Sequence, residues 1–441
     1  MSVNSGDTAW LLAASALVLL MAPGLALFYG GMVRSKSVLN MMMMTFGALA
    51  AVLVVWTLVG YSVAFGDDLG GGLLGNPAQY AGLGQLLDPA SSGTSTVPTI
   101  LFAVFQGLFA VITGALVSGA IADRAKFGAW LVFVSLWTLV VYAPVAHWVF
   151  DVSAGGHVGG WLVNRMGLVD FAGGTAVEIC SGASGLALAI VLGKRVGFGR
   201  DPMRPHNLTL VMLGAGLLWF GWHGFNAGSA LTAGHKAAVV FVTTTLAGAA
   251  GTLGWLALER MRDGKATSLG AASGLVAGLV AITPSCGSLT PVGALVMGAV
   301  AGAVCAVTVG LKFRFGYDDS LDVVGVHLVG GIVGTLGIGL LASGAAPTAV
   351  SGLFDGGGLT LLEHQLLGSA VVLVYAFVMS ALLGYAVQRV LGFRLIPEHE
   401  VTGIDLALHG ETAYDLHSLT AGRAGGHGIL RPHPHPEPDE Y

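Results

Sequence analysis

Long apolar stretches alternate with short polar connections along most of this chain. Each stretch holds about 20 residues with few charges, which is enough for one helix to cross a hydrocarbon layer of about 30 Å. The pattern predicts an all-α membrane protein with eleven transmembrane helices. The predicted spans are 9–32, 38–61, 98–120, 127–149, 170–192, 207–230, 237–258, 267–285, 291–311, 321–343 and 364–388.

The composition supports a membrane protein and excludes an ordinary soluble domain. Hydrophobic residues make up 54% of the chain and charged residues 10%, whereas soluble domains are about a quarter charged. The 69 glycines indicate helices whose backbones pack closely in lipid. The first stretch has no Lys or Arg before it, so it is expected to remain as a helix rather than to be cleaved as a signal peptide. Nothing indicates nucleic-acid binding, a metal site or a cofactor.

The basic residues fall almost entirely on alternate connections. Of the 19 Lys and Arg residues, only Arg165 and Lys236 lie on the side opposite to the C-terminal tail. Because basic residues beside spans stay in the cytoplasm, the N-terminus is predicted to lie outside and the C-terminus inside. Ends on opposite sides require an odd number of spans, in agreement with eleven. The glycine-rich segment 66–98, which has Asp but no Lys or Arg, is then extracellular.

The chain is expected to form a membrane domain, 1–392, a cytoplasmic regulatory tail, 393–420, and a disordered end, 421–441. The end contains RPHPHPEPDEY, in which the prolines interrupt any helix. His433 and His435 alternate with these prolines. Two histidines without acidic or thiol partners are a weak metal signal, so a soluble tail is the preferred interpretation.

Two predicted spans share one pattern of ionisable and glycine residues. In both, glycines follow the ionisable residue at offsets of four and seven: Gly182 and Gly185 after Glu178, and Gly331 and Gly334 after His327. These are the fifth and tenth spans, so the pattern predicts a five-plus-five inverted repeat with the eleventh helix as an extra one. Such repeats place the substrate site between the halves, near the bilayer midplane.

Few ionisable residues lie at membrane depth, where each is costly unless paired or hydrated and is therefore a functional candidate. They are Asp170, Glu178, His223, Asp322 and His327. Asp170, at the start of the fifth span, has two interpretations. It caps the helix, or it helps to position a cation through oriented backbone carbonyls, and both can hold.

Six segments resemble, in the same order, those of the ammonium transporter (Amt/Mep/Rh) family. They are APGLALFYGGMVRSK, GYSVAFG, QGLFAVITGALVSGAIADR, DFAGGTAVEICSGASGL, GWHGFNAGSA and DVVGVHLVGGIVG. The resemblance implies a homotrimer whose protomers each have a pore. It also implies inward conduction of ammonium across the cell membrane, as NH4+ or as NH3 with or without a proton, and no enzymatic activity. Methylammonium is a further candidate substrate.

The same resemblance implies an outer recruitment site that combines aromatic faces with a hydroxyl. Phe109 and Ser229 match it, and Asp170 is included among the substrate-binding residues. A second aromatic is supplied by Phe150 or Trp148, where the family usually has a tryptophan followed by glycines. Such cation–π contacts contribute about 0.5 to 2 kcal/mol each.

Below that site, the family closes its pore with two stacked phenylalanines. Phe109 and Phe225 match these positions, and Trp222 matches a pore-lining tryptophan. Without the motif, each phenylalanine would be interpreted as lipid or packing contact. His223, next to Trp222, is expected to make packing or lateral contacts.

Glu178 is a departure from the family, since most members place a histidine there. The resemblance pairs this carboxyl with His327 and makes the two a proton-handling pair, which we expect to titrate as one coupled unit. Some fungal ammonium transporters resemble this chain in carrying an acidic residue at that point.

The segment DLALHGETAY, 405–414, resembles the family's cytoplasmic tail, so a PII-type signalling protein at the inner face is an implied partner. An ammonium sensor with little or no conduction is the alternative function. The absence of an attached kinase or cyclase domain disfavours it. An intramembrane hydrolase that uses Asp170, Glu178 and His327 is disfavoured because no nucleophile or metal motif accompanies them.

Overall fold

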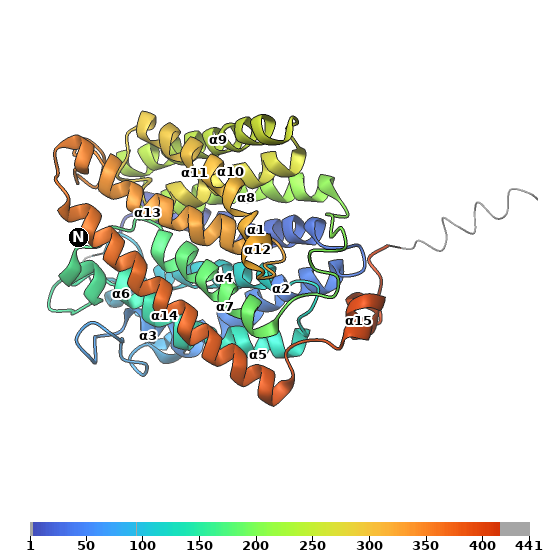
Figure 1. Cartoon of the computed structure of the whole chain (residues 1–441). Coiled ribbons are helices and arrows are strands. Elements are labelled where there is room, and N and C mark those ends of the chain that lie inside the picture. The colour runs from blue at the N-terminus through green and yellow to red at the C-terminus, as the bar shows by residue number, and fades with distance from the viewer. Residues whose placement is uncertain (1–2, 94, 415–441) are drawn as a thin grey trace, which may run out of the picture.

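The helices of this chain lie side by side in one bundle (Figure 1). The computed structural model describes residues 3–93 and 95–414, and this part of the chain contains helices but no β-strands. The α-helices are α1 (Ser5–Met32), α2 (Val38–Val55), α3 (Tyr61–Phe65), α4 (Thr99–Ala120), α5 (Phe127–Trp137), α6 (Ala143–Phe150), α7 (Cys180–Leu192), α8 (Leu208–Gly228), α9 (His235–Asp263), α10 (Ser268–Ile282), α11 (Pro291–Thr308), α12 (Leu311–Phe315), α13 (Val329–Leu341), α14 (Thr360–Leu391), α15 (Pro397–Thr402) and α16 (Ile404–His409).

Several of these helices are joined or preceded by π-helical turns, in which the hydrogen bonds span five residues. The π turns are Trp56–Gly60 between α2 and α3, Thr138–Tyr142 between α5 and α6, Leu162–Met166, Gly174–Ile179 before α7, and Val324–Leu328 before α13. Short 3₁₀ helices cover Ala81–Leu87, Pro89–Ser92 and Leu353–Asp355. The all-α prediction is confirmed.

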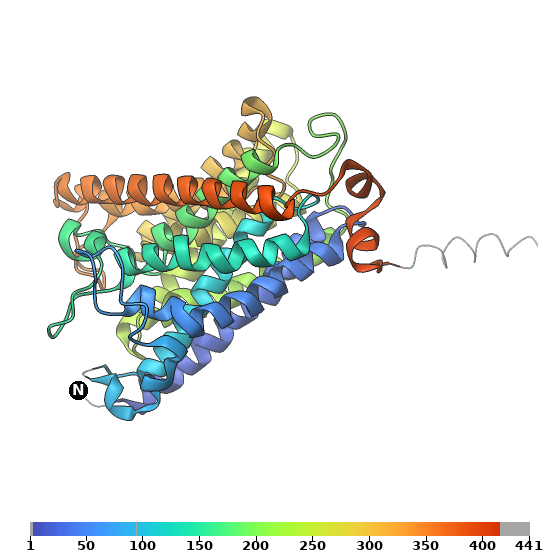
Figure 2. The same cartoon turned by 90° about the horizontal axis from the view of Figure 1, so that it is seen from below.

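Ten helical segments of the described chain are long and apolar enough to cross a membrane. They match ten of the predicted spans. The eighth predicted span, 267–285, corresponds to α10, a shorter apolar helix that ends at Ile282 and is followed by turns to residue 288. The N-terminus and α15 lie at opposite ends of the bundle (Figures 1 and 2). The predicted disordered end, 421–441, falls outside the described residues.

Capping side chains fix where several helices begin. Asn4 precedes α1, Asn207 precedes α8, Thr267 precedes α10 and Thr290 precedes α11. In each case the side-chain oxygen accepts a hydrogen bond from a backbone N–H two or three residues later. These N–H groups have no partner within the helix, so the caps stabilise the first turns.

The helices pack through small residues, as the glycine content predicted. A Cβ added at Gly302 on α11 would overlap the carbonyl oxygen of Gly251 on α9, and one at Gly298 would overlap that of Ala247. The α1–α8 contact has the same character, since a Cβ at Gly214 would overlap the Phe28 backbone. Close backbone approach is how helices gain packing energy where lipid supplies no hydrophobic drive.

Buried ion pairs join the connections at the α15 end of the bundle. The Arg195 guanidinium forms a bidentate pair with Asp318, with hydrogen bonds of 2.9 and 2.8 Å, and also donates to Asp123 at 3.0 Å. Arg34 reaches the same Asp123 carboxylate at 3.2 Å. The connections after α1, α4 and α7 and the one before α13 are therefore held together by charge-assisted hydrogen bonds.

The C-terminal segment is held against this end by a cap on α2. Asp405 of α16 accepts hydrogen bonds from the backbone N–H groups of Leu39 (3.0 Å) and Asn40 (2.8 Å). His409 Nε2 lies 3.1 Å from the Asn40 side-chain oxygen. A carboxylate at a helix N-terminus is favourable for the helix dipole, so the tail and α2 stabilise each other.

Replacing Gly302 with leucine tests the close contact between α9 and α11. Because the new side chain would overlap the Gly251 carbonyl, we expect Gly302→Leu to destabilise the protein by about 1–3 kcal/mol or more. Gly216→Leu is the control, since Gly216 is exposed on α8 with no atom within 4 Å of an added Cβ. Thermal unfolding in detergent measures both variants. Equal unfolding temperatures for the two would contradict close packing at Gly302.

Candidate functional site

Glu178 and His327 form a hydrogen-bonded pair inside the bundle. Glu178 Oε2 lies 2.7 Å from His327 Nδ1, and the two residues are only 1% and 4% exposed. Each residue belongs to a π-helical turn, Gly174–Ile179 and Val324–Leu328 respectively. Such turns replace regular α-helical hydrogen bonding and are frequent at functional sites.

Glycines allow the two turns to approach each other. A Cβ at Gly331, four residues after His327, would lie 2.8 Å from Glu178 Cβ. A Cβ at Gly182, four residues after Glu178, would overlap the Leu328 backbone. The glycines at the offset of four are therefore the contact points that bring the carboxyl and the imidazole together.

Asp170 makes the hydrogen bonds of a helix cap. Its carboxylate accepts backbone N–H groups of Gly173, Gly174 and Thr175, each at 2.7 Å, and the hydroxyl of Thr175. Asp170 was interpreted either as a helix cap or as a residue that helps to position a cation, and these hydrogen bonds are those of a cap. The cap fixes the first turn of the segment that carries Glu178.

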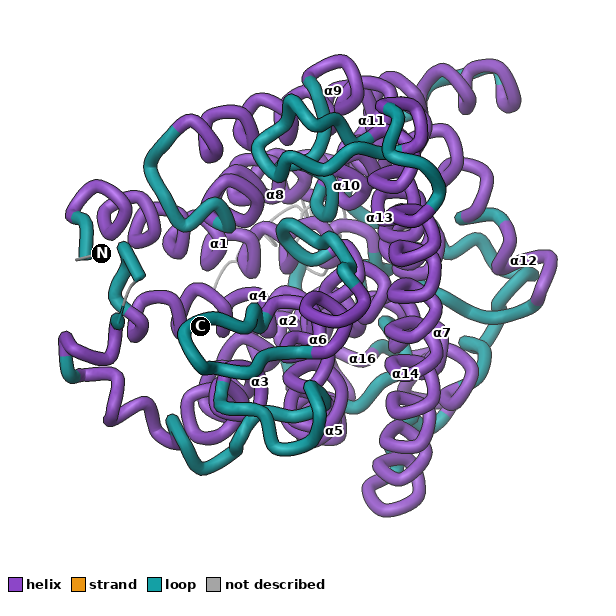
Figure 3. Tube along the Cα trace, turned by 90° about the vertical axis from the view of Figure 1, so that its left-hand side faces the viewer, coloured by secondary structure: helices purple, strands orange, loops and turns teal. Residues whose placement is uncertain are grey.

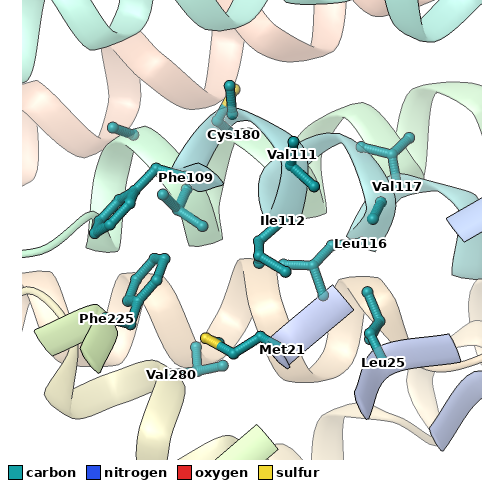
Figure 4. Packing of buried hydrophobic residues seen from close by; sticks show 14 of the residues in the cluster. Met21, Leu25, Phe109, Val111, Ile112, Leu116, Val117, Cys180, Phe225 and Val280 are labelled. Atoms are coloured by element: carbon teal, nitrogen blue, oxygen red, sulfur yellow. The ribbon is translucent and has the colours of Figure 1, made fainter. Parts of the chain in front are cut away.

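Two phenylalanines stack in the core beside this segment. Phe109 of α4 and Phe225 of α8 have ring centroids 3.9 Å apart with planes 10° from parallel, and both are buried. Figure 4 shows the two rings pointing toward each other from facing helices. Trp222, one turn before Phe225, has its ring 5.9 Å from that of Phe225 and donates from Nε1 to Thr283 Oγ1 at 2.8 Å.

On the other side of Phe109, the structure distinguishes the two aromatic candidates. Phe150 lies edge-on to Phe109, with centroids 6.3 Å apart and planes at 89°. Trp148 points elsewhere: its Nε1 donates to the Leu73 carbonyl at 2.8 Å, and its ring lies 4.6 Å from Tyr375 of α14. The interpretation of Trp148 as an aromatic of the outer site therefore does not fit the geometry, since the residue faces α14.

Two further candidates have local partners. Ser229 donates from its hydroxyl to the Phe225 carbonyl at 2.8 Å and leaves its own lone pairs free to accept. His223 Nε2 lies 2.9 Å from Thr245 Oγ1, and its ring is 4.2 Å from that of Phe241. His223 thus makes lateral contacts with α9. Within residues 3–93 and 95–414, no cluster of three or more His, Cys, Asp or Glu side chains could hold a metal ion.

The sequence of this chain matches that of one family over nearly its whole length. The model of the Ammonium Transporter Family matches residues 9–414. This chain belongs to the ammonium transporter family. The ammonium transporter of Mycobacterium tuberculosis (strain ATCC 25618 / H37Rv) is 58% identical over 435 residues, which cover 94% of this chain and 91% of that protein. The ammonium transporter of Bacillus subtilis (strain 168) is 46% identical over 417 residues, covering 93% and 99%.

Solved structures of the ammonium transporter family share the fold. Mep2 of Saccharomyces cerevisiae superposes with a TM-score of 0.82 at 36% identity, covering 90% of this chain and 89% of that one. A structure described as a sensor Amt protein has a TM-score of 0.84 at 27% identity, covering 91% and 98%.

One residue of this ammonium transporter's site was missed by sequence reasoning. Asp319 precedes His327 by eight residues, as Asp170 precedes Glu178, and its carboxylate accepts the N–H groups of Val323 (3.1 Å) and Val324 (2.8 Å). The shared spacing of eight residues between the aspartate and the ionisable residue of each turn was the sequence signal that could have identified Asp319. Asp322, the residue chosen instead, pairs with Lys312 at 2.6 Å and does not cap the turn.

The Asp170 cap can be removed without touching the Glu178–His327 pair. Because Asp170→Ala leaves at least three buried N–H groups without their partner, we expect a loss of stability of about 1–3 kcal/mol and reduced ammonium uptake. Asp170→Asn retains one acceptor oxygen and should lose less. Glu398→Ala, at an exposed carboxylate on α15, is the control. If Asp170→Ala unfolds at the wild-type temperature, the carboxylate does not support this turn.

Proposed function

We propose that each copy of this ammonium transporter conducts ammonium inward through its own pore. The proposed route passes Phe150, then the stacked Phe109 and Phe225, then the Glu178–His327 pair. The observation that carries the proposal is a buried carboxylate–imidazole pair in a chain of this family. The Phe150 ring lies against Gly173, the residue that precedes the turn with Glu178, so the aromatic group and the pair belong to one continuous path.

The physical problem for such a route is the charge of the substrate. An idealised Born estimate for moving a small cation into a low-dielectric interior is of order 20 kcal/mol, whereas neutral ammonia crosses at little cost. We therefore propose that ammonium gives up its proton before the hydrophobic part of the pore. Potassium has no proton to give, so this step also separates ammonium from a cation of similar size.

Glu178 and His327 are proposed to carry the released proton. The Glu178 carboxylate, which accepts a hydrogen bond from the imidazole, can take up a proton on one side of the pair. The His327 imidazole then releases a proton on the other side, because the two groups titrate together. Ammonia follows the pore, and the proton follows the pair. One ammonia and one proton then arrive inside for each ammonium ion that leaves the outside, and one positive charge crosses with each nitrogen.

The outer recruitment site is proposed to consist of Phe109, Phe150 and Ser229. The two rings offer aromatic faces to a cation, and the Ser229 hydroxyl can accept one N–H of ammonium. Asp170 contributes by holding the adjacent turn in place. Phe109 and Phe225 are the proposed gate, and Trp222 lines the pore below it.

Topology and assembly extend the proposal. We propose eleven spans with α10 as the eighth, an extracellular N-terminus, a cytoplasmic C-terminus and a five-plus-five inverted repeat followed by α14. The opposite positions of the N-terminus and α15 support an odd number of spans, and the matching offsets around Glu178 and His327 support the repeat. A homotrimer in the cell membrane, a regulatory tail at 393–420 and a PII-type partner at the inner face complete the proposal.

A sensor with little conduction is the alternative, because one structural relative is described as a sensor. It is less favoured, since the curated relatives at 58% and 46% identity are named transporters. The experiment is expression in a strain that lacks ammonium uptake, with growth on low ammonium as the readout and labelled methylammonium as the tracer. Restored growth is expected. No growth, with the protein present and folded in the membrane, would contradict transport.

Glu178 variants test the proton-handling pair. Glu178→Gln keeps the shape of the side chain but removes its titration, so we expect the ammonium-evoked current to fall by about a hundredfold or more, the lower end of what one acid–base group contributes. Glu178→His restores a titratable group and should retain a larger current with a changed pH dependence. Reconstituted proteoliposomes supply the measurement. If both variants keep the wild-type current and pH profile, Glu178 does not handle the proton.

A further inference from the structure

Five ionisable side chains form an alternating series of carboxylates and imidazoles at the N-terminal end of the bundle, the end that faces the viewer in Figure 3. We name it the outer ionisable chain. Its links are Asp68 Oδ1 to His147 Nε2 at 3.6 Å, His147 Nδ1 to Asp151 Oδ2 at 3.2 Å, Asp151 Oδ1 to His157 Nε2 at 2.9 Å, and His157 Nδ1 to Asp67 Oδ1 at 2.8 Å.

The outer ionisable chain leads from the interior to solvent. The His147 side chain is fully buried, whereas that of Asp67 is 65% exposed. Asp67 is fixed by Gln79, whose side-chain amide donates to it at 3.2 Å. A charge change at the exposed end can therefore reach the buried end through direct contacts.

The chain also joins separate segments of the fold. Asp67 and Asp68 follow α3, His147 belongs to α6, and Asp151 is the C-cap residue directly after α6. His157 lies on the connection that follows. That connection turns back tightly, with the Gly160 N–H donating to the Asp151 carbonyl at 2.9 Å. A Cβ at Gly160 would overlap the His147 carbonyl oxygen, so only glycine permits this return.

Phe150 lies between two members of this chain in sequence, His147 and Asp151. Its ring packs edge-on against Phe109 and lies against Gly173. Because Phe150 is the last residue of α6, its position depends on what holds the end of that helix. The imidazoles and carboxylates of the outer ionisable chain help to hold it, together with hydrogen bonds of His147 Nδ1 with the Ala64 carbonyl (3.0 Å) and of Asn164 with the Asp151 carbonyl (2.9 Å).

His157 is the member best placed to respond to the outside solution. Both of its ring nitrogens face carboxylate oxygens, an arrangement that satisfies two N–H donors and hence the imidazolium form. Burial opposes that charge, but the hydrogen bonds to Asp67 and Asp151 raise the pKa of His157 above its ordinary value. Tyr61 and Tyr80 line the same cavity of about 530 Å³, together with Asp67, Asp151 and His157.

We propose that the outer ionisable chain is a positioning device for Phe150 and that His157 makes it sensitive to extracellular pH. This inference rests on the proposed function. While His157 is protonated it bridges Asp67 and Asp151 and holds the end of α6. As the pH rises through its raised pKa, His157 keeps one N–H donor, the bridge is lost on one side, and Phe150 is held less firmly over Phe109.

The test measures ammonium-evoked currents in proteoliposomes as a function of ammonium chloride concentration, at external pH values from about 5.5 to 8, the range in which histidine titrates. The wild type should show a half-saturating concentration that rises with pH. His157→Gln should show the high value at every pH, about threefold to fivefold above wild type at the acidic end, the range expected for a partly exposed ion pair. Its maximal current should be retained.

Asp67→Asn separates titration from simple structural support. Removing this carboxylate lowers the pKa of His157, so the rise in half-saturating concentration should remain but move to lower pH. A purely structural role would change the current equally at all pH values. His235→Gln, at an exposed histidine at the start of α9 on the same end of the bundle, is the control and should match wild type.

The outcomes distinguish this inference from the proposed function. If the wild type carries neither current nor uptake, the proposed function fails. If the wild type conducts but His157→Gln and Asp67→Asn both keep its half-saturating concentration and pH profile, the positioning role is overturned. Should His157→Gln fail to fold, the direction of the shift in Asp67→Asn still decides: a shift to lower pH supports the inference, and an unchanged profile overturns it.

Discussion

The hydrogen bond between Glu178 and His327 joins two ionisable groups in the interior of the helix bundle. A carboxylate or an imidazolium alone in a membrane interior costs several kcal/mol, and each partner makes the other tolerable. Bringing them to 2.7 Å requires two helical turns to touch. Gly182 and Gly331 allow that contact. Asp170 and Asp319 then fix the starts of the two turns by accepting backbone N–H groups.

In the proposed function, the stacked aromatic rings form a barrier in front of this pair. The stacked rings of Phe109 and Phe225 are buried, so a hydrated ion has no room to pass them unless they move. In the proposed mechanism the barrier favours the neutral form of the substrate, and the pair provides a separate route for the proton. In our further proposal, the outer ionisable chain positions Phe150, which meets the substrate before either step. In these proposals, selectivity arises at the stacked rings and the Glu178–His327 pair, whereas the pH response arises nearer the surface, at the outer ionisable chain.

Local patterns in the sequence were sufficient for the helices and for part of the site. Apolar length predicted the spans because lipid imposes it, and the resemblance to the family paired Glu178 with His327. Asp319 lies eight residues before His327, as Asp170 lies eight before Glu178, but it went unnoticed because it precedes the predicted span 321–343, whereas Asp322 lies within that span. Trp148 and Phe150 both stayed candidates because they lie two residues apart on one short helix and point in different directions from its axis. Which of them faces Phe109 depends on tertiary packing, here on the contact of Trp148 with Tyr375. The end of α10 at Ile282 was likewise set by the turn that follows it.

The contacts that escaped prediction join residues far apart in the chain. His157 meets Asp67 across 90 positions, and no periodicity signals such a contact between loops. Asp405 caps α2 across 365 positions for the same reason.

In the proposed mechanism, one proton crosses with each ammonia through the Glu178–His327 pair. The most direct measurement is the ratio of charge to nitrogen in the same proteoliposomes, from the integrated ammonium-evoked current and the uptake of isotopically labelled ammonium. We expect one elementary charge per nitrogen in the wild type. Uptake at the normal rate without current would contradict it, because ammonia would then cross alone and the pair would move no proton.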